Sequence, residues 1–220
     1  MIRGAPWALV HMNLTNELSQ LIDQLEPIAR PGGQGRALMV MGAGRGDGAS
    51  TIAREIARLT ALRSQRGVWL FDLDFSTNPQ AKATRAHGGT YDATFGRTPF
   101  WSVQTDGGRA RVVARQTVIE NLFVTELQRD AGRVSQIGLR PSEAYWRAVR
   151  DSIDIAIIDV PGNATAPLSM VADLDGVILV ADERQRNSAG LLARRQAIES
   201  RGGVVAGMIL NRSPVSRRAA

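Results

Sequence analysis

Residues 41–51 read MGAGRGDGAST and directly follow a short apolar run. Four glycines alternate with other residues ahead of Ser50, as in loops that hold phosphate between a strand and a helix. Glycines let backbone N–H groups converge on an anion, and the start of the next helix adds partial positive charge. The spacing is that of G-x-x-x-x-G-K-[ST] counted from Ala43, but the lysine of that pattern is Ala49. The stretch therefore predicts a phosphate-type loop that lacks its cation.

Two other interpretations of the glycines remain open. Residues 44–49 also fit G-x-G-x-x-A, a weak fingerprint of dinucleotide binding. Such a site needs an acid about 20 residues further on, and Asp72 and Asp74 lie somewhat later. A tight strand-to-helix turn without any ligand is the third interpretation. We favour a nucleotide-type loop, intact or degenerate, because it gives a role to acids elsewhere in the chain.

The composition limits the function classes. A chain of 220 residues with 44% hydrophobic content fits one sizeable α/β domain. With no cysteine and only two histidines, we expect no thiol catalysis, no disulfide and no site built from Cys or His ligands to a metal. No apolar run approaches the roughly 20 residues of a membrane span. The net charge of +6 rests almost entirely on arginine, since Lys82 is the sole lysine, and the basic stretches lack interleaved aromatics.

The apolar pattern alternates between strands and helices. We expect strands at 37–42, 67–74, 121–127, 154–160, 175–182 and 204–211 and helices at 14–25, 50–63, 140–152 and 188–201. Residues 76–115 are expected to be loops with a short helix at about 79–85. Apolar strands that alternate with helices predict an α/β fold of three layers, in which helices cover both faces of a mostly parallel central sheet.

Polar side chains gather where the expected strands end. Parallel sheets place ligands at the carboxyl ends of their strands. Asp159 ends a buried strand and precedes Val-Pro-Gly, which is typical of the Walker B acid that orients magnesium and water. Asp72 and Asp74 lie two apart after another strand and therefore on one face, where paired acids suit magnesium or a catalytic base. Each acid alone is also consistent with a solvated strand end or a turn cap, but together with the loop they favour a nucleotide site.

Together these residues resemble the bacterial tyrosine-kinase branch of the deviant-Walker P-loop ATPases, within the MinD/ParA superfamily. The resemblance covers about residues 16–214. VMGAGRGDGASTIAREIA (40–57) is similar to the Walker A segment and first helix, VWLFDLDF (68–75) to the Walker A′ strand, and DIAIIDVPG (154–162) to Walker B. ADLDGVILVADERQRNSAG (172–190) and GGVVAGMILNRSP (202–214) are similar to the C-terminal half of that branch. There the Asn of an Asn-Arg pair, here Asn211, contacts the adenine base.

The resemblance implies a site and a domain plan. A P-loop NTPase-like, kinase-like domain would span 31–214, after an N-terminal segment and helix at 1–30 and before a disordered basic tail at 215–220. The implied cofactors are ATP or ADP with Mg²⁺, held by Ser50 and Asp159, with Asp72, Asp74 and Asp159 as catalytic acids. The implied nucleotide-binding residues are Gly44, Arg45, Gly46, Asp47, Gly48, Ala49, Ser50, Thr51 and Asn211.

The chain also departs from the pattern of that branch. The Walker A lysine is Ala49, and the second, signature lysine of the partitioning ATPases would fall at Gly44. Arg45 lies beside that position and can reach phosphate. The arginine that usually follows the Walker A′ acids is replaced by FSTNP, the N-terminal helix lacks the EAYR-like subunit-contact motif, and the C-terminal tyrosine cluster is missing. We therefore expect a pseudokinase or pseudo-ATPase, with no bound cofactor if the phosphate site is vestigial.

The implied role is in surface polysaccharide (exopolysaccharide or capsule) biosynthesis or export. We expect a cytoplasmic protein, peripheral at the inner face of the bacterial inner membrane, that regulates or scaffolds a chain-length co-polymerase there. A homo-oligomer is a further expectation, whereas no specific nucleic acid is expected. One alternative is an active ATPase or tyrosine kinase that uses Arg45 in place of the lysine. Others are a ParA/MinD-like positioning ATPase and, more remotely, an NAD(P)-dependent oxidoreductase.

Overall fold

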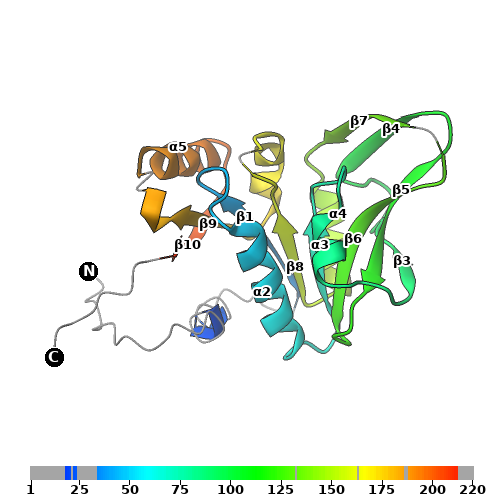
Figure 1. Ribbon diagram of the computed structural model, residues 1–220, viewed down its shortest axis with the longest axis horizontal. Coiled ribbons are helices and arrows are strands. Elements are labelled where there is room, and N and C mark those ends of the chain that lie inside the picture. Colours follow the sequence, from blue (N-terminus) through cyan, green and yellow to red (C-terminus); the bar gives the residue numbers. More distant parts are fainter. Residues whose placement is uncertain are drawn as a thin grey trace.

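An eight-stranded sheet runs through the protein in the order β10-β9-β1-β8-β2-β6-β5-β3 (Figure 1). The structure is a computed structural model, and it describes residues 18–20, 22–23, 34–131, 133–162, 164–185 and 188–212. The strands of this sheet are β1 (Arg36–Gly42), β2 (Val68–Asp72), β3 (Thr90–Asp92), β5 (Ala110–Gln116), β6 (Leu122–Arg129), β8 (Ile155–Asp159), β9 (Gly176–Asp182) and β10 (Val205–Asn211). The six strands from β10 to β6 are parallel, and β5 and β3 continue the sheet antiparallel at one edge.

The central parallel strands are covered on both faces. Every residue of β1, β2 and β9 is buried, and none of these strands alternates between apolar and polar side chains. Such strands need a cover on each side, and crossover helices supply it. The prediction of an α/β fold with a mostly parallel sheet is confirmed.

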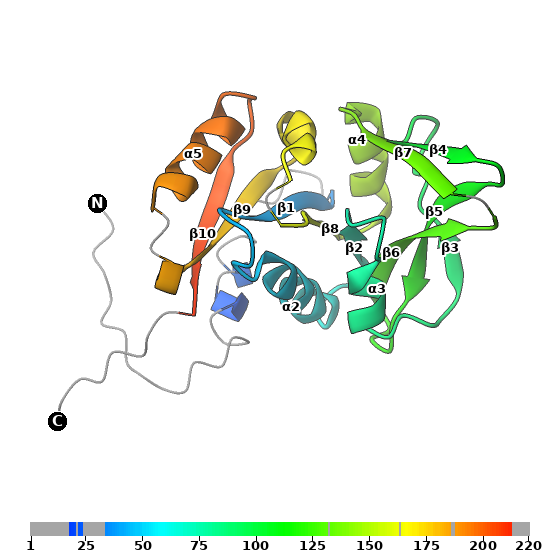
Figure 2. The same cartoon turned by 45° about the horizontal axis from the view of Figure 1, so that its top comes forward.

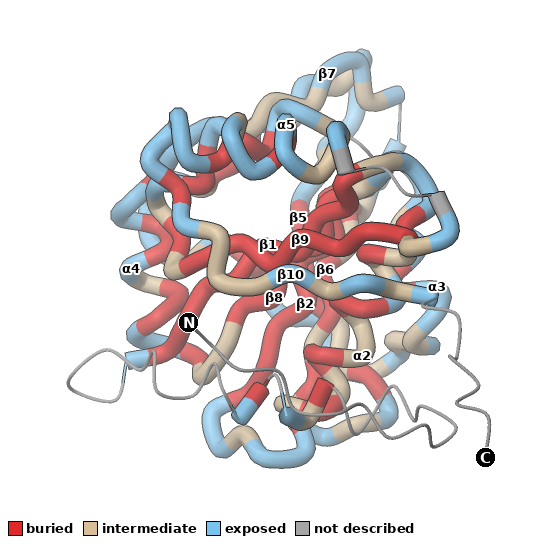
Figure 3. The backbone as a smooth tube through the Cα atoms, turned by 90° about the vertical axis from the view of Figure 1, so that its left-hand side faces the viewer, coloured by how far each residue is buried: buried red, intermediate tan, exposed pale blue. Residues whose placement is uncertain are grey.

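Helices cover both faces of the sheet (Figure 2). The helices are α2 (Ala49–Ala61), α3 (Pro79–Ala83), α4 (Glu143–Ser152) and α5 (Ser188–Glu199), with 3₁₀ segments η2 (Ala166–Asp173) and η3 (Glu183–Gln185). In α2, Ile52, Ile56 and Leu59 recur at helical spacing and pack against the β1 and β2 side chains of one face, which α3 also joins. On the other face, α4, η2 and α5 pack over a core rich in aromatic side chains. Figure 3 shows the buried strands enclosed between these two layers.

The N-terminal helix expected at 14–25 is described only at 18–20 and 22–23. These residues are helical, and Leu18 and Ile22 are buried in the core cluster that contains α2. The rest of that segment, and the basic tail at 215–220, lie outside the described residues. Among the helices that the structure describes, none combines the length and the apolarity needed to cross a bilayer.

The prediction that 76–115 consists of loops is wrong. This stretch contains β3, β5 and β4 (Trp101–Asp106), and β4 pairs with β7 (Arg133–Leu139) in a separate two-stranded ribbon. In β4 buried or half-buried residues alternate with exposed ones, and in β7 most residues are only partly covered. Antiparallel strands with one wet face show no continuous apolar run, so a search for such runs passes over them. The short helix expected at 79–85 is confirmed as α3.

Candidate nucleotide site

The glycine loop connects β1 to α2 as predicted. Gly46 and Gly48 have positive φ angles of 84° and 89°, a region that favours glycine. Gly48 is the N-cap of α2, and its carbonyl accepts the backbone N–H of Ile52 at 3.0 Å. The sequence pattern thus builds the strand-to-helix turn of a phosphate loop.

One N–H group of the loop already binds an internal anion. The carboxylate of Asp47 folds back so that Oδ2 accepts the backbone N–H of Gly44 at 2.6 Å. Asp47 is only 2% exposed, and its Oδ1 has no hydrogen-bond partner among the described residues. A carboxylate in this place uses a donor that a phosphate would need and adds negative charge to the loop.

The loop has no cation in the position of the missing lysine. Ala49 is buried in the first turn of α2. Arg45 is exposed, and within the described part of the chain it makes no hydrogen bond or ion pair. Ser50 is partly exposed, and Thr51 is exposed on the outer side of α2. The loop's own positive charge, on Arg45, therefore lies on a solvent-exposed side chain and not at the buried position of the missing lysine.

The predicted acids are brought together by strand pairing. Asp72 and Asp159 are direct neighbours in the parallel register of β2 and β8, and each is 1% exposed. Oδ1 of Asp72 accepts the N–H of Asp74 at 2.9 Å, and Oδ2 accepts the N–H of Gln80 at 2.8 Å. Two buried carboxyl groups thus lie at the ends of adjoining strands.

Gln80 fills the space between these acids and the glycine loop. Its side-chain Nε2 donates to Oδ2 of Asp159 at 2.6 Å and to the carbonyl of Ser50 at 2.8 Å. Its Oε1 accepts a hydrogen bond from Nη1 of Arg54 at 3.1 Å. Oδ1 of Asp159 has no hydrogen-bond partner among the described residues. The acid predicted to orient magnesium is therefore held by a neutral amide.

Asp74 has a different environment from the other two acids. Its carboxylate accepts hydrogen bonds from the backbone and hydroxyl groups of Ser76 and Thr77, at 2.5–3.2 Å. This arrangement is a side-chain-stabilised turn that leads into α3. Burial raises the pKa of Asp74, but the bonds from Ser76 and Thr77 outweigh it and leave the pKa below its ordinary value. A carboxylate so fully bound serves the turn rather than a proton transfer.

Burial changes the ionisation of the other two acids. Burial, with help from the nearby charges of Asp159 and Asp74, raises the pKa of Asp72 to about 7 despite the lowering effect of its two backbone hydrogen bonds. Burial also raises the pKa of Asp159, against the lowering effects of the Gln80 amide, the nearby Ser50 hydroxyl and the Arg54 charge. The pair therefore holds its protons more firmly than exposed carboxyl groups do.

Asn211 and its neighbour close the loop from the other side. Nδ2 of Asn211 donates to the carbonyl of Asp47 at 2.8 Å, and Nη1 of Arg212 donates to the carbonyl of Gly46 at 2.9 Å. Arg212 also pairs with Asp182 at 2.7 Å, and Arg184 pairs with the same carboxylate at 2.7 Å. The Arg184 guanidinium, with help from Arg212, holds the pKa of Asp182 well below its usual range. The end of β10 is thus tied to the glycine loop by side chains.

These residues do not fit a magnesium nucleotide. Magnesium requires a near-octahedral shell of oxygen ligands at about 2.0–2.1 Å, whereas one oxygen of Asp159 and the Ser50 carbonyl accept bonds from Gln80. Within the described residues, no group of three or more His, Cys, Asp and Glu side chains is arranged to hold a metal ion. In the loop, the backbone N–H of Gly44 already donates to Asp47, and the lysine that would bind phosphate is absent.

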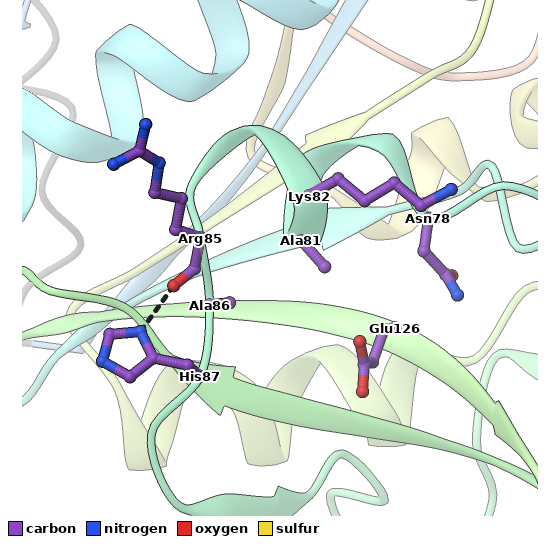
Figure 4. A pocket seen from close by; sticks show the side chains of 7 residues that line it. All are labelled: Asn78, Ala81, Lys82, Arg85, Ala86, His87 and Glu126. Atoms are coloured by element: carbon purple, nitrogen blue, oxygen red, sulfur yellow. Dashed lines mark hydrogen bonds between the residues drawn. The ribbon is translucent and has the colours of Figure 1, made fainter.

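A separate hollow of about 440 Å³ lies beside α3 (Figure 4). It is lined by Asn78, Ala81, Lys82, Arg85, Ala86, His87 and Glu126. None of the residues predicted to bind nucleotide lines it. Glu126, its acidic member, is already paired with Arg115 at 2.6 Å, so the hollow adds nothing to the nucleotide site.

Comparison with known proteins places this geometry in a structural class. No protein-family model matches the chain, and no curated protein matches it. Among solved structures, the kinase domain of the Escherichia coli tyrosine kinase ETK has a TM-score of 0.61 at 16% identity, covering 94% of this chain and 77% of that one. The VpsO kinase domain has a TM-score of 0.59 at 16% identity, covering 92% of this chain and 97% of that one.

The fold is that of a bacterial tyrosine kinase domain. The septum site-determining protein MinD from Pyrococcus horikoshii OT3, solved with Mg-ADP, has a TM-score of 0.52 at 17% identity, covering 83% of this chain and 72% of that one. The predicted P-loop NTPase-like architecture is therefore confirmed. At these identities the likeness establishes the kinase fold alone.

Several residues of this site escaped the sequence analysis. Asp182 ends β9 just as Asp159 ends β8, so the reasoning from strand ends could have found it. Gln80 and Arg54 carry no such signal, because their roles depend on how α3 and α2 pack together. Arg212 was visible only as the second member of the Asn-Arg pair.

Proposed function

We propose that this protein is a kinase-like component of surface polysaccharide biosynthesis or export that has lost phosphoryl transfer and acts as a regulator or scaffold. One observation carries the proposal: the lysine position of the phosphate loop is the buried methyl group of Ala49. Phosphoryl transfer depends mainly on positioned charge, so the loss of that cation costs several orders of magnitude in rate.

The proposed partner is a chain-length co-polymerase of the bacterial inner membrane, bound from its cytoplasmic side. The sequence resemblance to the bacterial tyrosine-kinase branch supports this role, and the fold shared with the ETK and VpsO kinase domains agrees with it. The chain would act there as a peripheral protein, alone or as a homo-oligomer. Co-sedimentation tests this: the protein should pellet with inner-membrane vesicles that contain the co-polymerase. Equal pelleting with vesicles that lack it would count against this partner.

Calorimetric titration with ADP and ATP tests whether the phosphate site is vestigial, because it measures nucleotide binding directly. We expect no binding heat from the wild type, and measurable ADP binding once Ala49→Lys restores a cation to the loop. Micromolar binding by the wild type would contradict a vestigial site. Gln136→Ala is the matched control, because Gln136 is exposed on β7 and is not part of the loop. It should bind nucleotide no better than the wild type.

The exposed side chain of Arg45 favours one other candidate function, an active ATPase or tyrosine kinase in which this arginine replaces the lysine. Arg45 lies in the loop and is not committed to another described group. This candidate predicts wild-type ATP turnover that falls at least about tenfold in both Arg45→Ala and Asp159→Ala. Turnover that is unchanged in either variant would come from a contaminant and not from this site.

A further inference from the structure

Gln80 contacts both buried acids at the strand ends, Asp72 and Asp159. Its backbone N–H binds Asp72, its side-chain nitrogen binds Asp159 and the Ser50 carbonyl, and its side-chain oxygen binds Arg54. The residue is only 1% exposed, and each of its side-chain polar atoms has a partner. A buried amide that is fully satisfied holds one position.

The orientation of the amide follows from the chemistry of its partners. The guanidinium of Arg54 can only donate, so the Gln80 oxygen must face it. The carbonyl of Ser50 can only accept, so the NH₂ group must face the loop and Asp159. The amide therefore presents its two N–H groups to the place where a cation would need oxygen ligands.

We propose that Gln80 is a built-in occupant of the metal position, an autoinhibitory side chain that keeps Mg²⁺ out. The proposal rests on the non-catalytic function proposed above and explains how the site stays closed without a ligand. The positive end of the amide satisfies Oδ2 of the buried Asp159, one of the oxygens that a cation would otherwise bind. A cation that entered would meet N–H dipoles of the wrong sign and would have to break two short hydrogen bonds.

The segment that carries Gln80 is held at two further points. Asp74 binds the backbone of Ser76 and Thr77 just ahead of α3. Asn78 has a positive φ of 47°, a left-handed conformation that asparagine adopts more readily than most residues other than glycine. Its side chain exchanges two hydrogen bonds with the backbone of Leu127, at 3.0 and 3.2 Å. These anchors place the start of α3, and with it Gln80, against the acids.

The first test is the near-isosteric substitution Gln80→Glu in the otherwise unchanged chain. It replaces the donating NH₂ group with a carboxylate oxygen that faces Asp159 and the Ser50 carbonyl. In EDTA, we expect the Gln80→Glu protein to have a lower Tm than the wild type. In millimolar Mg²⁺ or Mn²⁺ its Tm should rise by several degrees, since a bound cation stabilises the folded state. The wild type and Gln136→Glu should not respond to either ion. A metal-dependent Tm in the wild type, or a Gln80→Glu protein that neither ion stabilises, would overturn the proposal.

The second test separates this proposal from the loss of the lysine. Ala49→Lys should bind ADP equally with Mg²⁺ and with EDTA, because Gln80 remains in place. Ala49→Lys/Gln80→Ala should bind ADP at least about tenfold tighter with Mg²⁺, and Asp159→Asn should remove that difference. A tenfold Mg²⁺ effect in Ala49→Lys alone defeats the role of Gln80 but leaves the non-catalytic function standing. ATP turnover by the wild type defeats the function itself.

Discussion

Asp72 and Asp159 are adjacent in the register of β2 and β8, and both of their carboxyl groups accept a hydrogen bond from Gln80. Two buried acids at neighbouring strand ends repel each other when both are charged. A single residue, through its backbone and its side chain, offsets part of that repulsion. This arrangement makes the stability of the site depend on protonation.

The raised pKa of Asp72, about 7 in the folded protein, predicts that stability falls as pH rises. An acid with a raised folded pKa stabilises the fold fully below its unfolded pKa of about 4, and that contribution is lost as pH rises toward 7. We expect the free energy of unfolding to be about 2–3 kcal/mol smaller at pH 8 than at pH 5. Urea unfolding at several pH values measures it, and Asp72→Asn should flatten the curve.

Acids with a lowered pKa do not contribute to the change in stability between pH 5 and pH 8. The hydrogen bonds of Arg66, Ser64 and Gln65 overcome the effect of burial and lower the pKa of Asp154 to about 2. Its stabilising effect is present above pH 4 and lost only below, outside the window from pH 5 to 8. An unchanged slope in Asp72→Asn would show that another group carries the dependence.

The ion pair of Arg150 and Asp175 predicts a large loss of stability when it is broken. Nε of Arg150 lies 2.7 Å from Oδ2 of Asp175, and the two side chains are 4% and 6% exposed. Removal of Arg150 leaves the buried Asp175 with the backbone N–H of Ala37 but without its ion-pair partner, so Arg150→Ala should cost about 3–5 kcal/mol in urea unfolding. Arg147→Ala breaks an exposed pair with Glu143 on the same helix and should cost less than about 0.5 kcal/mol. Similar losses in both variants would refute this account.

The loop glycines predict unequal costs for the same substitution. A methyl group at Gly46 meets nothing within 4 Å, so Gly46→Ala costs only the strain of its positive φ, about 1 kcal/mol. A methyl group at Gly48 has the same strain and also runs into Nδ2 of Asn211. We expect Gly48→Ala to cost about 1–2 kcal/mol more in urea unfolding. Addition of Asn211→Ala should recover part of that excess; equal costs at the two glycines would contradict the contact.

The bond from Arg212 to the Gly46 carbonyl predicts that this arginine protects the loop from proteolysis. Arg45 is an exposed trypsin site within the loop. Arg212→Ala removes both the bond to Gly46 and the pair with Asp182, so cleavage after Arg45 should speed up about threefold to tenfold. Mass spectrometry of the first fragments measures this. Arg201→Ala, which removes a bond within a surface turn, should leave the rate unchanged.

The sequence predicts well those strands whose own side chains form a continuous apolar run. Apart from one charged residue at an end of each, β1, β2, β8 and β9 are apolar throughout, as is typical of buried parallel strands. β4 and β7 escape prediction because their partners decide which residues are covered. In the site, the acids at strand ends follow from topology, whereas Gln80 acts through a helix–sheet contact that only the folded chain contains.

The position of β1 has a consequence for synthesis of the chain. Its two hydrogen-bonded neighbours, β8 and β9, both come from the last third of the sequence. On the ribosome the strand that carries the glycine loop therefore emerges with both edges open, and at usual elongation rates it stays so for on the order of ten seconds. A nascent chain that stalls or is truncated before β9 presents an apolar strand with at least one unpaired edge, and such a fragment is a target for chaperones and a nucleus for aggregation.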